Sequence, residues 1–377
     1  LFPASSNFAT VEKKYKDDIF TTPAGSGVAV LGFNLDRQSY KHTAKKSDAE
    51  KSSTKKAILN KDFRQAVTFA LNRESYSAQV NGKEFAKPAI RNTYVAPAFV
   101  QVDGKDFGNV VADKLTTYGD QWKGINLADG QDGLYNKDKA KAQLEKAKAE
   151  LQKDGVQFPI HLDLPVDQSS KLNVAQAQSL KQTIEKSLGS ENVVIDINQL
   201  SSDDLQNATL NAANAAAEDW DISNSVAWAP DYQDPSTYLD IFKTTSSENT
   251  KTFMGYDDPN NAAAVQVGLK DYDALLNSAA SETSDLNVRY DRYAQAQAWL
   301  EDSSLVIPLT VGNGAAPVIS RLTPFTGASI QVGDKGSSYL KYVKSQEKVV
   351  TKKEYEQSRE KWLKERKASN EKAQKDL

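Results

Sequence analysis

Cysteine is absent from the 377-residue chain, and histidine occurs only twice. The lack of cysteine excludes disulfides, thiolate nucleophiles and cysteine metal ligands. Neither His42 nor His161 has a histidine, a cysteine or a carboxylate at metal-ligand spacing in the sequence. We therefore expect no zinc or other metal site, no cofactor bound through such ligands, and no catalysis that depends on a histidine base.

Long apolar runs and a large net charge are also missing. The mean hydropathy is −0.59, and no segment approaches the roughly 20 apolar residues that a transmembrane helix needs. The net charge of −3, from 47 basic and 50 acidic residues, does not favour nucleic acid as a partner. The patterns G-x-S-x-G, H-E-x-x-H, G-x-x-x-x-G-K-[ST] and G-x-G-x-x-G are absent, so none of the enzyme classes that they mark is indicated.

The most distinctive stretch that is present is Trp-Ala-Pro-Asp-Tyr-Gln-Asp-Pro, residues 228–235. Large and small or polar side chains alternate over residues 220–228, which predicts a strand that ends at Trp228. Asp234 followed by Pro235 is typical of a helix start, with the proline at the first helical position, and predicts a short helix over residues 236–242. A turn that contains Asp231 therefore joins a strand to a helix.

Asp231 is the first candidate for a ligand-binding residue. An acid flanked by Trp228 and Tyr232 can hold an amine or a small cation by its charge and by ring contacts. One alternative is that Asp231 caps local backbone while Trp228 fills the core. Another is a carboxylate pair with Asp234 for hydrolysis, although Asp234 is better explained as a helix N-cap.

The order of expected elements indicates an α/β fold. Strands over 158–164 and 193–197 flank a helix over 172–188, which predicts a parallel crossover unit. With a further helix and the strand that ends at Trp228, three strands would place their carboxyl ends near the Asp231 turn. The other expected elements are a strand over 28–34, a helix from Asp62, a helix from Asp138 to Gly155, a helix from Ser201 or Ser202 through Ala217, helices over 260–280 and 284–303, a strand over 305–311 with Pro308 at a sheet edge or lobe crossing, and a charged helix over 351–377 that docks through Tyr355, Trp362 and Leu363.

Two segments are expected to be irregular. The lysine-rich residues 36–57 read as a solvated linker, and residues 84–135 as a long loop-rich stretch. The acidic run 129–136 suggests calcium binding, but an EF-hand frame would place Ala128 at the first ligand position. Turn chemistry is the better interpretation of that run.

Four segments, in the same order, resemble the oligopeptide- and dipeptide-binding family of extracellular solute-binding proteins. They are the signature at 228–235, which an aromatic residue and Leu follow, the strand 28–34 ending in Asn, the helix 62–74 with its Arg-x-Ala pattern, and the helix 289–300 with Ile-Pro-Leu at 307–309. The composition, rich in Lys, Asn, Ser and Ala without cysteine, is similar to that of the streptococcal surface lipoproteins of this family.

The resemblance implies a periplasmic-binding-protein-like fold of type II. Residues 58–310 would form a complete second α/β lobe. Residues 1–57 would be a remnant of the first lobe with a crossover strand, and residues 311–377 a return to that lobe followed by the charged helix. Because no signal peptide follows Leu1, we expect a chain without most of the first lobe and without the lipid anchor of the family's exported proteins.

The function that the resemblance implies is that of a non-enzymatic substrate-binding component of a peptide ABC importer. The expected partners are oligopeptides and the transporter permease, with the full-length protein a monomer on the extracellular face of the cell membrane, attached only through a lipid anchor. Cofactors and nucleic acid are not expected. The alternatives are a surface peptide sensor or adhesin without transport and, less favoured, a carboxylate-dependent hydrolase.

The resemblance also implies roles for individual residues. Asp231 would pair with the α-ammonium group of the peptide, and hydrogen bonds from residues 225–229 would meet the peptide backbone as an added strand would. Some family members carry a basic residue directly before the signature Trp for the peptide carboxylate, whereas Ala227 precedes it here, which favours longer peptides. The expected ligand-binding residues are Phe33 and Asn34 at the hinge-side rim, together with Ser225, Trp228, Ala229, Asp231 and Tyr232.

Overall fold

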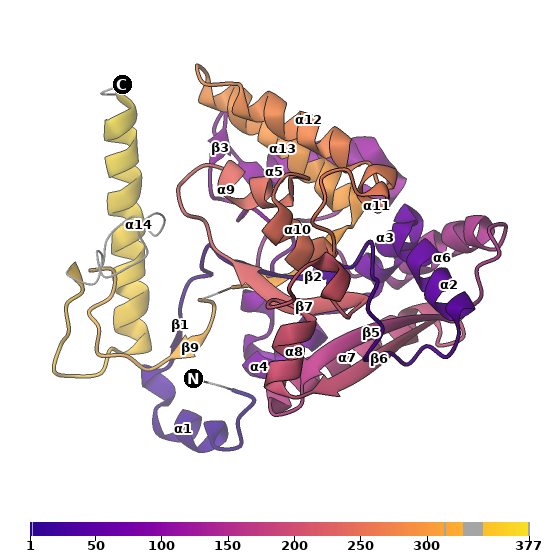
Figure 1. Ribbon diagram of the computed structural model, residues 1–377. Coiled ribbons are helices and arrows are strands. Elements are labelled where there is room, and N and C mark those ends of the chain that lie inside the picture. Colours follow the sequence, from indigo (N-terminus) through magenta and orange to yellow (C-terminus); the bar gives the residue numbers. More distant parts are fainter. Residues whose placement is uncertain (2, 313, 327–341, 376–377) are drawn as a thin grey trace.

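The computed structural model describes residues 1, 3–312, 314–326 and 342–375 (Figure 1). They form a large α/β body and a smaller part to one side of it, which contains the long C-terminal helix. Within the described residues, no helix combines the length and the apolar character needed to cross a membrane.

The centre of the body is a three-stranded sheet. Strand β2 (Val28–Phe33) lies between β7 (Ile222–Trp228) and β8 (Val306–Val311), and it is antiparallel to both. All but one of the β2 side chains are buried. The expected strands 28–34 and 305–311 are therefore confirmed, and Pro308 lies on an outer strand of this sheet, where a missing N–H is tolerated.

A second sheet contains the predicted crossover unit. Strands β5 (Ile160–Asp167) and β6 (Val193–Leu200) are parallel, and α7 (Lys171–Leu188) connects them. The prediction that the strand ending at Trp228 adds a third parallel strand is wrong, because β7 pairs with β2 instead. It meets β5 only at its beginning, where the Asp221 N–H donates to the Asp163 carbonyl at 3.1 Å. Alternation in a sequence identifies a buried face but does not identify the neighbouring strand.

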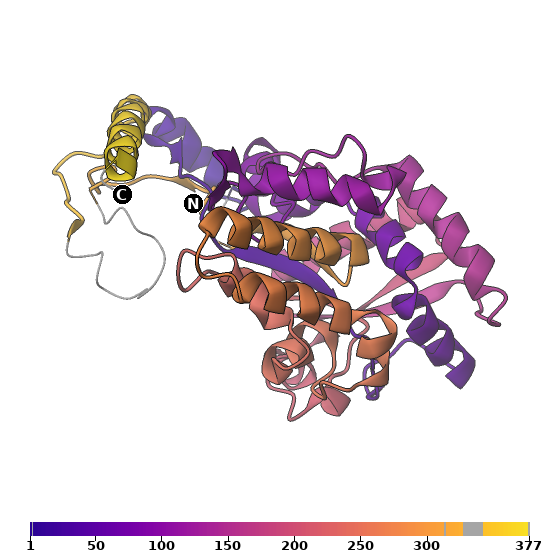
Figure 2. The ribbon, with the colours of Figure 1, turned by 90° about the horizontal axis from the view of Figure 1, so that it is seen from above.

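Helices cover both sheets. In Figure 2, α13 (Leu286–Ser303) lies between α12 (Leu269–Ala280) and α5 (Phe107–Leu115), and it packs against both. The side chain of Asn60 caps α3 by accepting from the Phe63 N–H at 2.9 Å. The helices of the body, apart from α7, are α2 (Asp48–Leu59), α3 (Lys61–Ala70), α4 (Arg73–Phe85), α5 (Phe107–Leu115), α6 (Lys137–Leu151), α8 (Ser202–Ala208), α9 (Ser236–Leu239), α10 (Ser247–Met254), α11 (Ala262–Gln266), α12 (Leu269–Ala280) and α13 (Leu286–Ser303).

Three expectations for irregular or helical segments need correction. Residues 36–57 are not a solvated linker, since α2 begins inside them with a reciprocal capping box between Ser47 and Glu50. Residues 84–135 contain α5 and the short hairpin of β3 (Gln101–Val102) and β4 (Lys105–Asp106). The helix capped by Ser201 ends at Ala208 rather than Ala217, because the backbone leaves the helical region at the next residue.

The smaller part contains α1 (Phe8–Lys14), α14 (Lys352–Lys375) and the two-stranded sheet of β1 (Phe20–Thr21) and β9 (Pro317–Val318). Aromatic rings attach α14 to this sheet region: Tyr355 stacks on Phe20 with ring centroids 4.1 Å apart, and Trp362 stacks on Phe325 at 5.1 Å. Tyr355 and Trp362 are thus confirmed as docking residues. Most of the expected return segment, residues 313 and 327–340, lies outside the described residues.

Two adjacent chain segments connect the smaller part to the body. The Gly312 N–H donates to the Gly27 carbonyl at 2.7 Å, and the Ala315 N–H donates to the Pro23 carbonyl at 2.9 Å. The two segments approach closely at Gly312, where a Cβ would lie 3.1 Å from the carbonyl carbon of Gly27, tighter than most Cβ contacts. The connection is therefore a paired, hydrogen-bonded crossing.

Candidate functional site

The turn after β7 places its acid and aromatic side chains at the surface. Asp231, Tyr232 and Gln233 are exposed, and 52% of Tyr232 is accessible to solvent. The Asp231 N–H donates to the Thr237 hydroxyl at 2.9 Å, and the Tyr232 hydroxyl lies 3.2 Å from that of Ser236. Local hydrogen bonds thus fix the backbone of this turn while the Asp231 side chain stays at the surface.

Asp234 has a structural role in the same turn. It accepts from the Ser236 N–H at 3.0 Å, and Arg289 binds both of its carboxylate oxygens, at 2.8 and 3.2 Å. Burial opposes its ionisation, but the hydrogen bonds from Arg289 and Ser236 outweigh burial and hold the pKa of Asp234 below its ordinary value. The helix begins at Ser236, one residue after the expected Pro235. The N-cap position is thus occupied by Pro235 and not by the expected Asp234. Asp234 accepts from the first helical N–H and forms an ion pair with Arg289, which does not support a catalytic pair with Asp231.

Trp228, at the end of β7, packs the start of the turn against the hydrophobic core. It is partly buried, and its ring makes edge-to-face contacts with Phe242 and Phe253 at centroid distances of 5.4 and 5.2 Å. Its indole N–H is buried without a hydrogen-bond acceptor among the described residues. The alternative that Trp228 fills the core is therefore correct for most of its ring.

The outer edge of β7 leads to this turn. Ser225, Ala227 and Ala229 are exposed, whereas Val226 between them is buried. In the described sheet β7 is an outer strand, with β2 on its other side. The backbone near Ser225 to Ala229 is thus placed at a sheet edge, which is the feature that an added peptide strand requires.

Phe33 and Asn34 do not lie with the other expected site residues. Trp228 pairs with Val28, while Phe33 pairs with Ile222 at the opposite end of the strands. Five residues of strand separate the two ends, or about 17 Å at ~3.3 Å per residue. Phe33 is fully buried and Asn34 is 1% exposed. The prediction that they form a rim of the same site is wrong, because the antiparallel pairing sends them away from it.

A cavity of about 1110 Å³ lies between the body and the smaller part. Gln233 brings the Asp231 turn to its border, and the Gln233 side-chain amide donates to the Phe99 carbonyl at 3.1 Å. On the other side, Tyr355 and Trp362 of α14 line the cavity. The turn, the body and α14 therefore border one solvent-accessible space.

Arg91 is a wall residue of this cavity that the sequence did not indicate. Its side chain is 1% exposed and forms two bonds to Asp129, at 3.1 and 2.7 Å. It also donates to the carbonyls of Gly25, Ser26 and Gly27 at distances between 2.9 and 3.1 Å. Arg91 thus ties the segment that crosses to the smaller part onto the body. Asp129 belongs to the acidic run 129–136, and its ion pair with Arg91 gives it a structural role.

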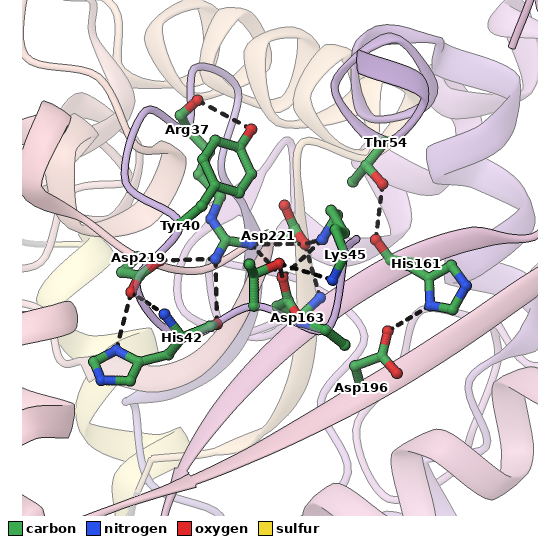
Figure 3. A network of polar contacts seen from close by, with 12 residues as sticks. Arg37, Tyr40, His42, Lys45, Thr54, His161, Asp163, Asp196, Asp219 and Asp221 are labelled. Atoms are coloured by element: carbon green, nitrogen blue, oxygen red, sulfur yellow. Dashed lines mark hydrogen bonds and ion pairs between the residues drawn. The ribbon is translucent and has the colours of Figure 1, made fainter. Parts of the chain in front are cut away.

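A second polar network is buried at the beginning of β7 (Figure 3). Arg37 bonds to Asp163 at 2.6 Å and to Asp219 at 2.7 Å, and Lys45 bonds to Asp163 at 2.7 Å and to Asp221. All five side chains are at most 2% exposed. Burial opposes ionisation of Asp163, yet the charges of Lys45 and Arg37 outweigh it and lower its pKa. The segment expected to be a solvated linker is thus held by a buried ionic cluster.

The two histidines each contact one aspartate. His42 Nδ1 lies 2.9 Å from Asp219, and His161 Nδ1 lies 2.7 Å from Asp196 (Figure 3). Both carboxylates are far from the histidines in sequence, so spacing gave no signal for either contact. Within the described residues, no group of three or more histidine, cysteine or acidic side chains is arranged to hold a metal ion.

Comparison with known proteins identifies the family. The model of the bacterial extracellular solute-binding proteins, family 5, middle region, matches residues 1–250. The chain belongs to this family. It is 64% identical over 378 aligned residues to the oligopeptide-binding protein AmiA of Streptococcus pneumoniae, and 57% identical to the oligopeptide-binding protein SarA of Streptococcus gordonii. Each alignment covers 100% of this chain and 57% of the relative, so the chain spans little more than half of their length.

Solved structures of the same fold agree with the assignment. An oligopeptide ABC transporter substrate-binding domain from Bacillus anthracis gives a TM-score of 0.56 at 20% identity, covering 90% of this chain and 53% of that one. Peptide-bound OppA of Listeria monocytogenes gives 0.53 at 22% identity, covering 84% and 49%. The fold is therefore that of the type II periplasmic-binding-protein-like peptide-binding proteins, and the expectation from sequence is confirmed.

Proposed function

We propose that this protein is the peptide-binding component of an ABC importer and captures oligopeptides by their free amino end. Family membership and relatives named as oligopeptide-binding proteins support the class of ligand. The observation that carries the proposal for this chain is the exposed Asp231 turn, which borders a cavity of about 1110 Å³. A cavity of that size exceeds the usual range for small ligands and suits a peptide.

The binding mode follows from the chemistry of the turn. The carboxylate of Asp231 would pair with the peptide α-ammonium group, and Tyr232 would cover it from one side. The peptide backbone would hydrogen-bond to the outer edge of β7 between Ser225 and Ala229, which makes recognition tolerant of side chains. Phe33 and Asn34 have no part in this mode, because they lie at the other end of the strand.

We extend the same proposal to the lobes and the location of the whole protein. Residues 58–310 act as one lobe, while residues 1–57 and 311–377 contribute a crossing strand and the return to a second lobe. The complete protein works as a monomer on the extracellular face of the membrane, held by a lipid anchor, and passes its peptide to a permease. It has no enzymatic activity; the ion pair of Asp234 with Arg289 removes the most obvious partner for catalysis by Asp231.

The test compares the full-length protein with its Asp231→Asn variant by calorimetry, using a peptide mixture with free amino ends and the same mixture after N-acetylation. Replacing the carboxylate should weaken binding of the free peptides by about 2–5 kcal/mol. The control is Asp203→Asn, which removes an exposed aspartate on α8 away from the turn. Equal affinity of the wild type for free and acetylated peptides would remove amine recognition from the proposal.

A further inference from the structure

The turn that carries Asp231 lies next to the segment that leads to the smaller part. Trp228, the last residue of β7, pairs with Val28, the first residue of β2. Residues 25–27, the crossing segment, directly precede Val28 in the chain. The Asp231 turn directly follows Trp228. The antiparallel pairing therefore brings the crossing segment and the turn to the same end of the central sheet.

Tyr238 of α9 connects the body to the crossing segment. It is fully buried, and its hydroxyl donates to the Ser26 carbonyl at 2.6 Å. The same carbonyl accepts from Arg91 at 2.9 Å. Burial raises the pKa of Tyr238 above its ordinary value, so its hydroxyl remains a donor at neutral pH. Two buried side chains from different parts of the body thus hold one carbonyl of the crossing segment.

Short contacts also join Tyr238 to the Asp231 turn. Thr237, its neighbour in the chain, accepts the Asp231 N–H through its hydroxyl at 2.9 Å. Phe99 packs edge-to-face on the Tyr238 ring with centroids 5.1 Å apart, and its carbonyl accepts from the Gln233 side chain at 3.1 Å. The turn, α9 and the crossing segment are therefore linked by consecutive hydrogen bonds and ring contacts.

This network gives a ligand at the turn a physical route to the crossing segment. An ammonium group bound by Asp231 favours one arrangement of an exposed turn over others. Because the Asp231 N–H is attached to Thr237, the same arrangement fixes the start of α9 and the direction of the Tyr238 hydroxyl. Coupling between two sites is reciprocal, so an ordered crossing segment in turn favours the ligand-bound turn.

We propose that Tyr238 is a positioning residue that couples binding of a peptide amino end at Asp231 to the ordering of the crossing segment. The inference rests on the proposed peptide-binding function and adds a route from the binding turn to the connection between the body and the smaller part. Its reporters are the N–H groups of Gly312 and Ala315, which donate to carbonyls on the paired stretch of chain around residues 25–27. Tyr238 is buried, so it acts through the network and does not touch the ligand.

Hydrogen exchange of the full-length protein, with and without a peptide mixture that has free amino ends, measures this ordering. In the wild type, bound peptide should slow exchange at Gly312 and Ala315 by about 5-fold or more, the lower end of ordinary coupling between sites. Tyr238→Phe keeps the ring against Phe99 and removes only the hydroxyl. In this variant, the slowing should fall below about 2-fold, because the link to the crossing segment is missing.

Calorimetry with the same peptides tests whether the contacts form one route. Tyr238→Phe and Thr237→Val each remove one hydroxyl, and each should weaken binding about 2- to 10-fold, the range for one hydrogen bond. Members of one route are not independent, so the double variant should bind within about 2-fold of either single variant. Thr237→Ser keeps the hydroxyl and should behave as the wild type. If Tyr238→Phe does not fold, the comparison of Thr237→Val with Thr237→Ser carries the test.

The matched control is Tyr94→Phe. Tyr94 is also fully buried, and its hydroxyl donates to the Val306 carbonyl. Val306 pairs with Gly32, at the opposite end of β2 from Val28. The control therefore removes an equivalent buried hydrogen bond away from the turn and the crossing segment. It should preserve both the peptide affinity and the slowed exchange at Gly312.

The outcomes separate the coupling from the proposed function. Bound peptide that leaves exchange at Gly312 and Ala315 unchanged in the wild type, or slows it equally in Tyr238→Phe, would overturn the coupling and leave peptide binding intact. Losses of affinity that multiply in the double variant would overturn the single route. Loss of the response in Tyr94→Phe would show a general loss of stability and would also overturn it. Failure of the wild type to bind any peptide would reject the proposed function itself.

Discussion

Replacement of Lys45 by methionine is expected to destabilise the protein strongly. Lys45 is fully buried and bonds to Asp163 and Asp221, which share Arg37 as their other cation. Without Lys45, three buried carboxylates, including Asp219, face one guanidinium. Breaking a buried ion pair by removing one partner costs about 3–5 kcal/mol, which is a large fraction of the stability of an ordinary domain.

Urea unfolding at pH 7, followed by circular dichroism, measures this loss. The control is Lys51→Met, since Lys51 forms a surface pair with Asp48, whose side chain is 97% exposed; it should cost about 0–1 kcal/mol. The second variant, Lys45→Met with Asp163→Asn, should recover part of the loss because it removes one of the unpaired charges. A Lys45→Met variant that unfolds within 1 kcal/mol of the wild type would refute the account of the cluster.

The same cluster predicts a pH dependence. The folded state lowers the pKa of Asp163, so its contribution to stability is complete above the ordinary aspartate pKa of about 4. That contribution is lost as the pH falls toward the lowered pKa of the folded state. In Lys45→Met, a smaller shift of this pKa should bring the acid-induced loss of stability to a higher pH, and an unchanged acid profile would contradict this reasoning.

Two further predictions concern other charged groups that are buried or partly buried. Burial raises the pKa of Glu218 to about 9, so the folded state binds a proton that the unfolded state releases, and stability falls as the pH rises from about 4.5 to 9. Glu218→Gln should remove this fall and be more stable than the wild type by up to about 5 kcal/mol at pH 8 but not at pH 4, as thermal unfolding can measure. Arg289→Met, which leaves Asp234 unpaired, should cost about 1–3 kcal/mol in urea, against about 0–1 kcal/mol for Arg292→Met, whose side chain is 39% exposed.

The elements that sequence predicted well are those determined by local interactions. The alternation that ends at Trp228 gave β7, and the apolar spacing after Asp62 gave α3, because these patterns report a buried face directly. The cap of α8 was also predictable, since Ser201 is among the residues expected there. The N-cap of α9 is Pro235 and not the expected Asp234, although Asp234 bonds to the first N–H of that helix. The position of the exposed Asp231 turn could also be predicted, because the end of a strand and the start of a helix define it.

The features that sequence did not predict depend on contacts distant along the chain. Lys45 was read as a solvated linker residue because its partners, Asp163 and Asp221, are more than a hundred residues away. Arg91 gave no signal because its acceptors are mostly backbone carbonyls. The misplacement of Phe33 has the same cause, since strand composition does not specify the partner or its direction.

The central claim, that Asp231 holds the amino end of a bound peptide, is tested most directly by native mass spectrometry of the full-length protein purified without denaturation. Wild type and Asp231→Asn are analysed in parallel, with sequencing of the peptides that each releases. The account predicts that the wild type carries peptides with free amino ends and that the variant is largely empty. Equal peptide occupancy of the two proteins, or peptides with blocked amino ends on the wild type, would contradict it.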